Sequence, residues 1–590
     1  MTIDTIPQQF LDVVETFDKK AAFRHKKGGR FVDVSHRETL ERVHQTALGL
    51  RALGLTKQDR VGVLSENRLE WAIADLAILT AGGITVPVYP SLPVNQVEYI
   101  LQDSGARAIF VSTADQARRV AECRAPALQH VFAFDPHCRG EGVMTLEEVA
   151  ALGAKVENKP TYRELISTIG REDCASIIYT SGTTGEPKGA VLTHWNILTN
   201  VRDCLSVLRL GPEDTCLSFL PLSHALERTA GYYVMLTAGV TIAYAETVDT
   251  VAEDMIEVSP TVMIAVPRFY EKIYARVLDT VERSSAVTQG LFRWAVKTGR
   301  KYVAEKTSGG ASGRTRSARV LADALVFRKL KARTGGRIRF FVSGGAPIAR
   351  EIIEFFHAAG VPILEGYGLT ETSPVLSVNT FDDFKLGTVG KPLPHVEIRI
   401  AEDGEILARG DNVMQGYYRK PRETSEAIID GWFHTGDIGH LDEHGFLVIT
   451  DRKKDVIVTA GGKNVAPQAI ENQLKNSKYI DEVVLIGNRR KFISAVIVPN
   501  FENLLKSTVS QGLPTENPGE LLRQPQVREL FAAEVDRLCE PFAPFERVKQ
   551  FVLLDRPLSI ASGELTPSLK VKRRIVEEKL MAQIDALYHS

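Results

Sequence analysis

The densest group of phosphate-binding residue types in this sequence lies in one stretch, residues 179–189. The stretch contains three glycines, four Ser or Thr hydroxyls and one lysine. Glycines let backbone N–H groups approach an anion closely, and hydroxyls and a lysine add donors and positive charge. An apolar, strand-like run precedes the stretch at 175–178, and residues 190–196 can lead into a helix. The pattern predicts a loop that holds a polyphosphate through Thr180, Ser181, Gly182, Thr183, Thr184, Gly185 and Lys188.

The spacing of this loop does not fit the Walker sequence G-x-x-x-x-G-K-[ST]. Gly182 and Gly185 are only three positions apart, and Lys188 follows a proline and precedes Gly189. The other interpretation is an ordinary Gly- and Thr-rich turn between two elements. The number of hydroxyls and the lysine favour the phosphate loop.

Three further segments carry residue types that suit nucleotide chemistry. Tyr367 lies between two glycines, so its ring can stack on a purine, and Glu371 lies between two threonines. Its carboxylate suits Mg²⁺, a hard ion that prefers oxygen ligands. Asp437 ends the segment 431–437 and can accept hydrogen bonds from two ribose hydroxyls. Residues 563–573 form a basic cluster near the C-terminus.

Composition indicates an ordinary globular protein of several lobes. The chain has 590 residues, 44% of them apolar and 25% charged, with a net charge of −1, so nothing global indicates a nucleic-acid partner. The first residues lack a basic and apolar leader, which argues against secretion and predicts a cytoplasmic location. Six cysteines without a C-x-x-C pair predict free thiols rather than a metal site. Prolines or glycines interrupt the uncharged runs 76–97 and 229–245, which favours buried elements over membrane spans.

The elements that must position these residues alternate between strand and helix. Strand-like runs at 61–64, 84–89 and 108–111 enclose helix-like segments at 70–80 and 94–103. Such alternation predicts a parallel sheet covered by helices. The pattern resumes at 177, at 262–266 and at 340–342.

Residues 291–340 differ from the rest of the chain in charge. The segment contains fourteen Lys and Arg residues but only two acidic residues, Glu305 and Asp323, and a Gly/Ser break lies at 307–313. One interpretation is a solvated helical hairpin with a mobile tip. The other is a patch for an anionic substrate or for anionic lipid headgroups, which would give peripheral contact with the inner face of a membrane.

A second domain is predicted after residue 450. Residues 442–446 form a predicted hairpin turn, and the charged run 451–455 is typical of a link between domains. Beyond it, strands at 483–486, 493–498 and 551–554 and a helix at 526–538 predict a small α+β unit. We therefore expect an N-terminal domain at 1–450, a hinge at 451–455 and a C-terminal domain at 456–590.

Together, and in this order, these segments resemble the AMP-forming acyl- and aryl-CoA synthetases, the adenylate-forming superfamily. The resemblance covers nearly the full chain and is strongest at 179–189, 367–372, 435–437, 451–467 and 563–573. The passages 220–228, 342–347 and 458–467 look most like the bacterial long-chain fatty acid–CoA ligases. The resemblance implies an α/β fold. A large N-terminal domain of parallel and mixed sheets layered with helices, as in acetyl-CoA synthetase, would carry a small mobile α+β domain.

The activity that the resemblance implies uses ATP, Mg²⁺ and coenzyme A. A fatty acid carboxylate would attack the α-phosphate, giving acyl-AMP and pyrophosphate, and the thiol of CoA would then displace AMP. Lys570 matches the catalytic lysine, because Arg573 follows it at the family's offset. Many relatives have Gly-Lys there, so Lys572 is the rival. His224 matches a position at the mouth of the acyl pocket, where it would gate the pocket or orient the carboxylate; the other interpretation is a structural histidine.

Further roles follow from the same resemblance. Glu371, with Thr183 and Thr184, would hold Mg²⁺. Lys454 matches the hinge about which the C-terminal domain rotates between the two half-reactions. Gly461, Gly462 and Lys463 would line the CoA tunnel. The adenine and ribose would contact Gly345, Ala346, Pro347, Gly366, Tyr367, Gly368, Thr370, Asp437 and Arg452.

Several alternatives stay open at this point. The acceptor can be a carrier protein, as in a fatty acyl-AMP ligase, and the acid can be aromatic or of medium length. A luciferase-like oxygenase is a further alternative. A different class is a non-catalytic nucleotide-binding protein. Acyl chain length and oligomeric state are undetermined.

Overall fold

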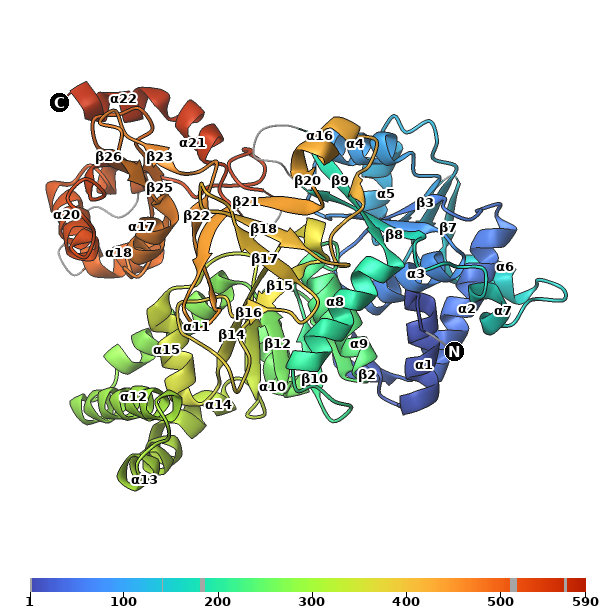
Figure 1. Cartoon of the computed structure of the whole chain (residues 1–590), viewed down its shortest axis with the longest axis horizontal. Coiled ribbons are helices and arrows are strands. Elements are labelled where there is room, and N and C mark those ends of the chain that lie inside the picture. The colour runs from blue at the N-terminus through green and yellow to red at the C-terminus, as the bar shows by residue number, and fades with distance from the viewer. Residues whose placement is uncertain are drawn as a thin grey trace.

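The computed structural model describes residues 3–138, 140, 142–180, 186–509, 517–566 and 570–589. Its long N-terminal part forms one large body, and the last part of the chain forms a smaller body beside it (Figure 1). The large body stacks its layers as helix, sheet, helix, sheet and helix, with the main hydrophobic core between the two large sheets.

The first large sheet has eight strands in the order β19-β9-β8-β4-β3-β5-β6-β7. The strands predicted at 61–64, 84–89 and 108–111 are confirmed, and they pair in parallel. The helices predicted at 70–80 and 94–103 are α3 and α4. The bounds of these strands are β3 (Arg60–Leu64), β4 (Ile84–Val88), β5 (Ala108–Val111), β6 (His130–Ala133), β7 (Val143–Thr145), β8 (Cys174–Thr180), β9 (Lys188–Thr193) and β19 (Gly416–Tyr417).

Helices cover both faces of this sheet. Helix α3 lies between the two large sheets, which is why every residue from Trp71 to Thr80 is buried. Helices α4 and α5 cover the outer face through a separate apolar cluster. The helices of this region are α1 (Ile6–Phe17), α2 (His36–Ala52), α3 (Leu69–Thr80), α4 (Val94–Ser104), α5 (Ala114–Ala121), α6 (Leu146–Ala154), α7 (Tyr162–Ile166) and α8 (His194–Val207).

The predicted phosphate loop is shorter than expected, and it joins two strands. Strand β8 continues to Thr180 and β9 begins at Lys188, antiparallel to it, so the loop is the tip of a hairpin. Residues 190–193 continue β9, and the helix begins only at His194. Close packing across the pair requires Gly189, because a Cβ there would lie 2.6 Å from Ile177 Cγ2. Ser181 to Gly185 lie outside the described residues.

The second large sheet has nine strands in the order β16-β15-β14-β13-β12-β10-β11-β1-β2. Strands β12, β13 and β14 are parallel, so their carboxyl ends meet at one edge, where open α/β sheets bind ligands. The bounds are β1 (Phe23–Lys27), β2 (Arg30–Val34), β10 (Thr215–Ser218), β11 (Thr241–Tyr244), β12 (Val262–Ala265), β13 (Phe340–Ser343), β14 (Ile363–Gly368), β15 (Val375–Val378) and β16 (Lys391–Pro392).

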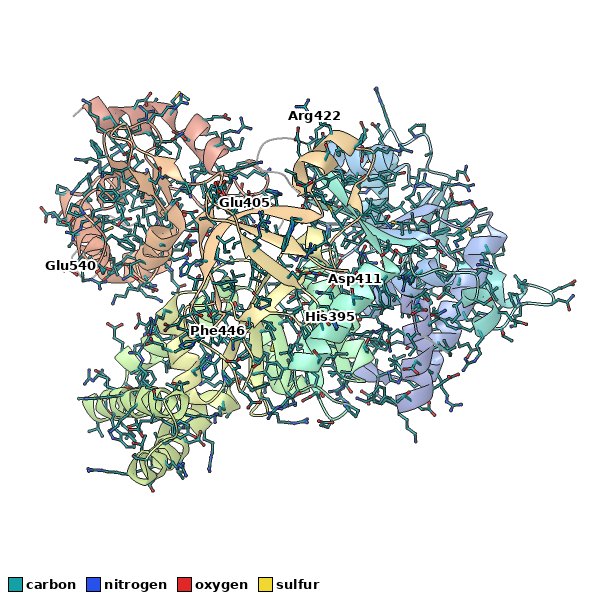
Figure 2. All side chains as sticks on the ribbon, in the orientation of Figure 1. His395, Glu405, Asp411, Arg422, Phe446 and Glu540 are labelled. Atoms are coloured by element: carbon teal, nitrogen blue, oxygen red, sulfur yellow. The ribbon has the colours of Figure 1, made fainter. Side chains whose placement is uncertain are left out.

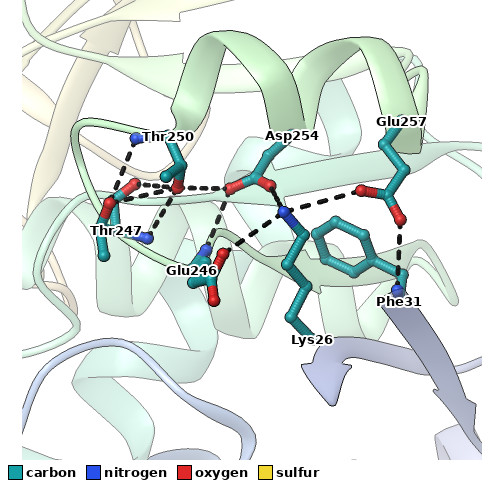
Figure 3. A network of polar contacts seen from close by, with 7 residues as sticks. All are labelled: Lys26, Phe31, Glu246, Thr247, Thr250, Asp254 and Glu257. Atoms are coloured by element: carbon teal, nitrogen blue, oxygen red, sulfur yellow. Dashed lines mark hydrogen bonds and ion pairs between the residues drawn. The ribbon is translucent and has the colours of Figure 1, made fainter. Parts of the chain in front are cut away.

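The outer face of the nine-stranded sheet is covered by α10 (Val251–Val258), α11 (Pro267–Glu282) and α15 (Arg350–Ala359). Lys26 ties the edge hairpin β1–β2 to α10, because its ammonium lies 2.7 Å from Asp254, 3.4 Å from Glu246 and 3.7 Å from Glu257 (Figure 3). Between the sheets run the π-helix η1 (Glu227–Val234) and α9 (Met235–Thr237).

The basic segment forms an arm of helices beside α15. These are α12 (Ala286–Thr307), α13 (Gly313–Ala322), the π-helix η2 (Asp323–Phe327) and α14 (Arg328–Ala332). The Gly/Ser break at 307–313 separates α12 from α13, as expected. The arm projects from the large body in Figure 1.

A third, antiparallel sheet of five strands lies between the large sheets and the C-terminal part. It contains the hairpin predicted around 442–446, which joins β21 to β22. The elements here are η3 (Thr370–Thr372), β17 (Glu397–Ile400), β18 (Glu405–Arg409), α16 (Pro421–Ala427), β20 (Ile428–Ile429), β21 (Trp432–Leu441) and β22 (Leu447–Arg452).

The C-terminal part has its own sheet, β25-β26-β27, and its own apolar clusters. The strands and the helix predicted there are confirmed within one to three residues. The elements are β23 (Ile457–Val458), β24 (Asn464–Val465), α17 (Pro467–Leu474), β25 (Ile480–Ile486), β26 (Ile493–Pro499), α18 (Phe501–Val509), α19 (Pro518–Leu521), α20 (Pro525–Cys539), β27 (Val548–Leu553), α21 (Arg573–Lys579) and α22 (Met581–His589). Among the described residues, no helix combines the length and apolarity that crossing a membrane requires.

Candidate active site

Lys570 reaches from the C-terminal part toward carboxylates of the large body. Its backbone N–H donates to Thr566 Oγ1 at 3.0 Å, and its carbonyl accepts from the N–H of Thr566 at 2.7 Å, so these two hydrogen bonds fix the backbone of Lys570. Lys570 is exposed as a residue, and neighbouring protein groups partly desolvate its ammonium. Burial and the positive charge of Arg452 lower the pKa of Lys570 to about 8, while the carboxylates of Asp437 and Glu371 act in the opposite direction. Lys570 therefore shares one electrostatic environment with three of the predicted site residues.

Lys572, the rival for the same role, lies differently. Its N–H donates to the carbonyl of Glu564 at 2.8 Å, and it stands directly before α21. Arg573 points into the C-terminal part, where its guanidinium contacts Glu471 Oε1 and the carbonyl of Leu485, both at 2.6 Å. Arg573 thus anchors the segment that follows Lys570.

Asp437 is held between an aromatic and a cation. Tyr367 Oη donates to one carboxylate oxygen at 2.6 Å, and Arg452 Nε lies 3.2 Å from the other. Asp437 and Arg452 are cross-strand partners on β21 and β22, so the hairpin sets their separation. The backbone N–H of Asp437 donates to Thr435 Oγ1 at 3.1 Å. The predicted ribose and adenine residues therefore meet, although they come from β14, β21 and β22.

Glu371 lies where β14, the phosphate hairpin and β19 converge. Its Oε1 accepts from Tyr417 Oη at 2.9 Å and, through a longer contact of 3.5 Å, from Thr180 Oγ1. The ammonium of Lys188 lies over the ring of Tyr417, 5.1 Å from its centroid. Lys188 and Glu371 are therefore neighbours of one tyrosine. A buried carboxylate beside a threonine hydroxyl is a donor set that fits Mg²⁺. Thr183 and Thr184, the other predicted ligands, lie outside the described residues.

His224 faces the same region from the large body. Its Nδ1 accepts from the N–H of Leu226 at 3.1 Å, and its ring meets Tyr89 edge to face at 6.4 Å. Burial, reinforced by the charge of Lys570, lowers the pKa of His224 to about 4, so the imidazole is neutral at pH 7. A neutral imidazole can donate or accept a hydrogen bond without adding charge.

A buried polar network fixes the loop that carries His224. Asn67 donates to the carbonyl of Leu220 and accepts from the N–H of Leu222 at 2.8 Å. Behind the loop, the first residue of η1, Glu227, accepts from Ser218 Oγ at 2.6 Å, and burial raises the pKa of Glu227 to about 8. This network joins the His224 loop to both large sheets.

The predicted adenine-binding glycines lie at the carboxyl ends of β13 and β14. Gly345 has φ +83°, which a side chain would strain, and Gly345, Ala346 and Pro347 are exposed at this edge. At Gly368 a Cβ would lie 1.7 Å from the carbonyl oxygen of Pro374, so only glycine fits between β14 and β15. Gly366 and Thr370 flank this position on the same segment.

Two residues of this region are not among those predicted from the sequence. Tyr417 contacts both Glu371 and Lys188, but a tyrosine in a Gly-Tyr-Tyr sequence carries no signal of that contact. Glu365 ends the apolar run of β14 directly before Gly366, and it has no hydrogen bond or ion pair from its side chain within the described part of the chain. Burial raises its pKa to about 8. A carboxyl closing an apolar strand was a signal that could have identified it.

The predicted hinge run is anchored on its N-terminal side. Asp451 and Arg452 belong to β22 rather than to a free link, and Lys453 forms ion pairs with Asp403 at 2.6 Å and Glu405 at 2.8 Å. Figure 2 shows Glu405 on the side of the large body that faces the C-terminal part. Lys454 is the first exposed residue beyond these anchors.

The predicted CoA-tunnel residues remain within the C-terminal part. The hairpin of β23 and β24 holds Gly462 at φ +72°, and the ammonium of Lys463 lies 5.8 Å from the ring of Phe545 in the same part. In this orientation it is Lys570 that interacts electrostatically with Glu371 and Asp437.

Comparison with known proteins agrees with this architecture. The sequence matches the family described as AMP-binding enzyme over residues 10–418, and that described as AMP-binding enzyme C-terminal domain over residues 454–590. It is 38% identical over 573 residues to the long-chain-fatty-acid–CoA ligase FadD15 of Mycobacterium tuberculosis, covering 95% of this chain and 93% of the relative. It is 30% identical to the peroxisomal long chain acyl-CoA synthetase 7 of Arabidopsis thaliana, covering 99% and 86%.

Solved structures show the same fold. The anthranilate CoA ligase AuaEII in complex with anthranoyl-AMP superposes with a TM-score of 0.75 at 18% identity, over 99% of both chains. ATP-bound MatB from Rhodopseudomonas palustris superposes with a TM-score of 0.70 at 24% identity, over 98% of this chain and 99% of that one. The predicted α/β fold with a large N-terminal and a smaller C-terminal domain is thereby confirmed. Taken with the family matches, these results show that the chain belongs to the AMP-binding enzyme family.

Proposed function

We propose that this protein is a long-chain fatty acid–CoA ligase that works through an acyl-adenylate. The observation that carries the proposal is the position of Lys570, which interacts electrostatically with Glu371, Asp437 and Arg452 although it comes from the other domain. The likeness to FadD15, a long-chain-fatty-acid–CoA ligase by name, supports this choice of substrate.

In the first half-reaction a carboxylate oxygen of the acid attacks the α-phosphorus of ATP. The bond from that phosphorus to the bridging oxygen breaks, and pyrophosphate leaves. Two anions meet in this step, so donors and positive charge must be in place where charge accumulates. Lys570 supplies one positive charge there. The neutral His224 donates to the acid without the cost of ionising a buried imidazole. Lys188 and the hairpin tip hold the departing pyrophosphate.

The nucleoside is bound by the group around Asp437. Its carboxylate accepts from the ribose hydroxyls, and the ring of Tyr367 stacks on adenine. Glu371 with Thr180, Thr183 and Thr184 would hold Mg²⁺, which supplies charge neutralisation for the phosphates when bound. Gly345, Ala346 and Pro347 line the other side of the nucleotide.

In the second half-reaction the thiolate of CoA attacks the acyl carbon and AMP leaves. The C-terminal domain rotates about Lys454, withdrawing Lys570 and bringing Gly461, Gly462 and Lys463 to the site. An acceptor thiol on a carrier protein is the alternative. The oligomeric state does not enter this mechanism.

One assay separates these possibilities. Pyrophosphate release is measured with acids from acetate to oleate and with an aromatic acid, each with and without CoA. We expect pyrophosphate and thioester with long-chain acids. Release of pyrophosphate without thioester indicates a carrier-protein acceptor. A preference for a short or aromatic acid contradicts the assignment of a long-chain substrate. No release with any acid contradicts the proposal that the protein is an enzyme of this class.

We also propose that the arm α12–α14 gives the enzyme peripheral contact with an anionic membrane. Apolar side chains stand exposed on it, including Val320 at 70%, Leu321 at 51% and Leu325 at 43%. They lie among the arginines and lysines of the segment 291–340. Exposed apolar groups within a basic surface suit a layer of anionic headgroups above acyl chains.

Flotation with vesicles tests this contact. We expect binding to phosphatidylglycerol vesicles and little binding to phosphatidylcholine vesicles. Val320→Ser with Leu321→Ser should weaken binding, whereas Val248→Ser, at an equally exposed position away from the arm, should not. Equal binding by all variants rejects the arm as the contact.

A further inference from the structure

One face of α11 contacts the C-terminal domain along its length. Arg268, near the start of the helix, forms an ion pair with Asp481 on β25, and its guanidinium lies 3.4 Å from the carbonyl oxygen of Asp481. Glu282, the last residue of α11, lies 3.3 Å from the ammonium of Lys478. Figure 1 places α11 between the arm and the C-terminal domain.

A third pair of opposite charges lies between these two. Burial by itself would lower the pKa of Lys475, but the carboxylates of Glu482 and Glu271 together raise it. Glu482 belongs to the same domain as Lys475, whereas Glu271 lies on α11, one turn after Arg268. Arg268 itself lies 3.5 Å from Glu271. The charges on α11 are therefore complementary to those of residues 475–482.

The spacing of these contacts bears on the orientation of the domain. Arg268 and Glu282 are fourteen positions apart, which is about 21 Å along a helix. A single contact would leave the domain free to turn about it, whereas two distant contacts resist rotation. The same orientation is the one that brings Lys570 toward Glu371 and Asp437.

Arg268 is also close to the site in the large body. It follows β12 by three residues, and a Cβ on Gly345 would lie 3.8 Å from Val266 Cγ1. The anchor of the C-terminal domain therefore stands at the same sheet edge as the loop that we assign to the nucleotide. Val266, which lies against this loop, is only two residues before Arg268 in the chain.

We propose that Arg268 and Asp481, supported by Glu282 and Lys478, are positioning residues that hold the C-terminal domain in the orientation for adenylate formation. They act through Lys570, which reaches the site only while this interface is closed. Rotation about Lys454 separates the pairs, so their strength sets the balance between the two half-reactions. This inference rests on the proposed two-step function.

These ion pairs are weak enough to break and re-form, so they do not fix the domain in one orientation permanently. The side chains of Arg268 and Asp481 are 44% and 34% exposed, and those of Lys478 and Glu282 are 55% and 67% exposed. Partly exposed pairs contribute modestly and are screened by salt. The interface can therefore open within a catalytic cycle.

The test measures the two half-reactions separately. Adenylate formation is followed by pyrophosphate release without CoA, and thioester formation by single turnover of supplied acyl-AMP with CoA. Arg268→Asp should slow adenylate formation by about fivefold, because an exposed pair contributes roughly that factor. Thioester formation should stay equal or become faster. A residue needed only for folding would slow both.

Charge exchange supplies the decisive control. Asp481→Arg should reproduce the effect from the other domain, and the double variant Arg268→Asp/Asp481→Arg should recover adenylate formation. Arg276→Asp makes the same charge change at an exposed position of α11, where the described residues offer no ion pair, and should change neither step. Raising the salt concentration should slow adenylate formation in the unmodified protein more than in Arg268→Asp.

The outcomes are distinct from those of the function test. If no acid releases pyrophosphate from the unmodified protein, the proposed function fails. If pyrophosphate is released normally and the single variants change neither step, or the exchange rescues nothing, the positioning role is rejected. Should Arg268→Asp fail to fold by thermal melting, Asp481→Arg alone carries the comparison of the two steps.

Discussion

Tyr417 Oη donates a hydrogen bond to Glu371 Oε1 over 2.9 Å, while the ring of Tyr417 lies under the ammonium of Lys188. One side chain thus joins the carboxylate that we assign to Mg²⁺ with the lysine that we assign to pyrophosphate. These three residues come from β19, η3 and β9, which are brought together because β19 pairs with β9.

Removing only this hydroxyl should weaken the use of Mg²⁺. In Tyr417→Phe the ring stays under Lys188, but Glu371 loses a donor worth about 1.5–3 kcal/mol. We expect pyrophosphate release to fall about tenfold or more at low Mg²⁺ and to need more Mg²⁺ for half-saturation. Direct titration with Mn²⁺ should show weaker binding in the presence of ATP. Tyr418→Phe, whose ring lies beside Arg419, is the control, and equal metal dependence in both variants would contradict the role.

The pKa of Lys570 predicts proton uptake when ATP binds. Burial and Arg452 hold the pKa at about 8, so near pH 8 about half of the free protein carries an uncharged lysine. The negative triphosphate favours the charged form and raises the pKa, so binding takes up a proton at pH 8 and none at pH 6, where the lysine is already charged. Calorimetry in two buffers of different ionisation enthalpy measures this uptake.

The matched variants for that experiment are Lys570→Ala and Lys572→Ala. The first should abolish the uptake and lower adenylate formation by about 10²–10³-fold, as expected for loss of one donor to developing charge. The second should keep the uptake. If Lys572→Ala loses it instead, the two lysines must exchange roles.

Asp437 should account for the preference for a ribose over a deoxyribose. With Asp437→Asn, a charge-assisted acceptor becomes a neutral one, and ATP should bind about tenfold more weakly. The difference in affinity between ATP and 2′-deoxy-ATP should shrink in the variant, which a double-mutant cycle measures. An unchanged difference would place the ribose elsewhere.

Lys454→Pro should impair thioester formation more than adenylate formation. Lys453 is held by Asp403 and Glu405, so rotation must begin at the next residue, and proline fixes its φ. Single-turnover measurement of each half-reaction gives the comparison. Equal loss of both steps would count against a hinge at this position.

A buried ion pair predicts a large change in stability. Arg228 and Asp75 pair at 2.5 Å with side chains 2% and 0% exposed. Asp75→Asn leaves the guanidinium without a counter-charge and should lower the free energy of unfolding by about 3–5 kcal/mol. Asp18→Asn, in the solvent-exposed pair with Arg37, should change the free energy of unfolding far less. Chemical denaturation measures both, and similar losses would contradict the argument.

Much of the secondary structure could be read from local patterns. The strands β3, β4 and β5 and the helices α3 and α4 lie within one or two residues of the predicted ranges, because burial on a parallel sheet requires continuous apolar runs. The phosphate loop was the exception. A run of Gly and Thr predicts a turn, but it does not indicate that the chain returns as an antiparallel strand.

The site itself was predicted residue by residue through a resemblance, and its contacts were not. Tyr367 and Asp437 were each assigned to the nucleotide, yet no spacing indicated that Tyr367 donates to Asp437. Tyr417 carries no local signal that singles it out, because its contacts are with Lys188 and Glu371, far along the chain. Glu365 does carry one, the carboxyl that closes an apolar run, but that signal does not indicate its burial.

The sequence by itself determined which residue types are available for chemistry and where most of the buried strands and helices lie. These depend on interactions between residues a few positions apart. Only the tertiary structure decided that Lys570 faces Glu371, Asp437 and His224, and that Arg268 meets Asp481. Such contacts depend on how two separately packed domains are oriented, and no local pattern in the sequence records that orientation.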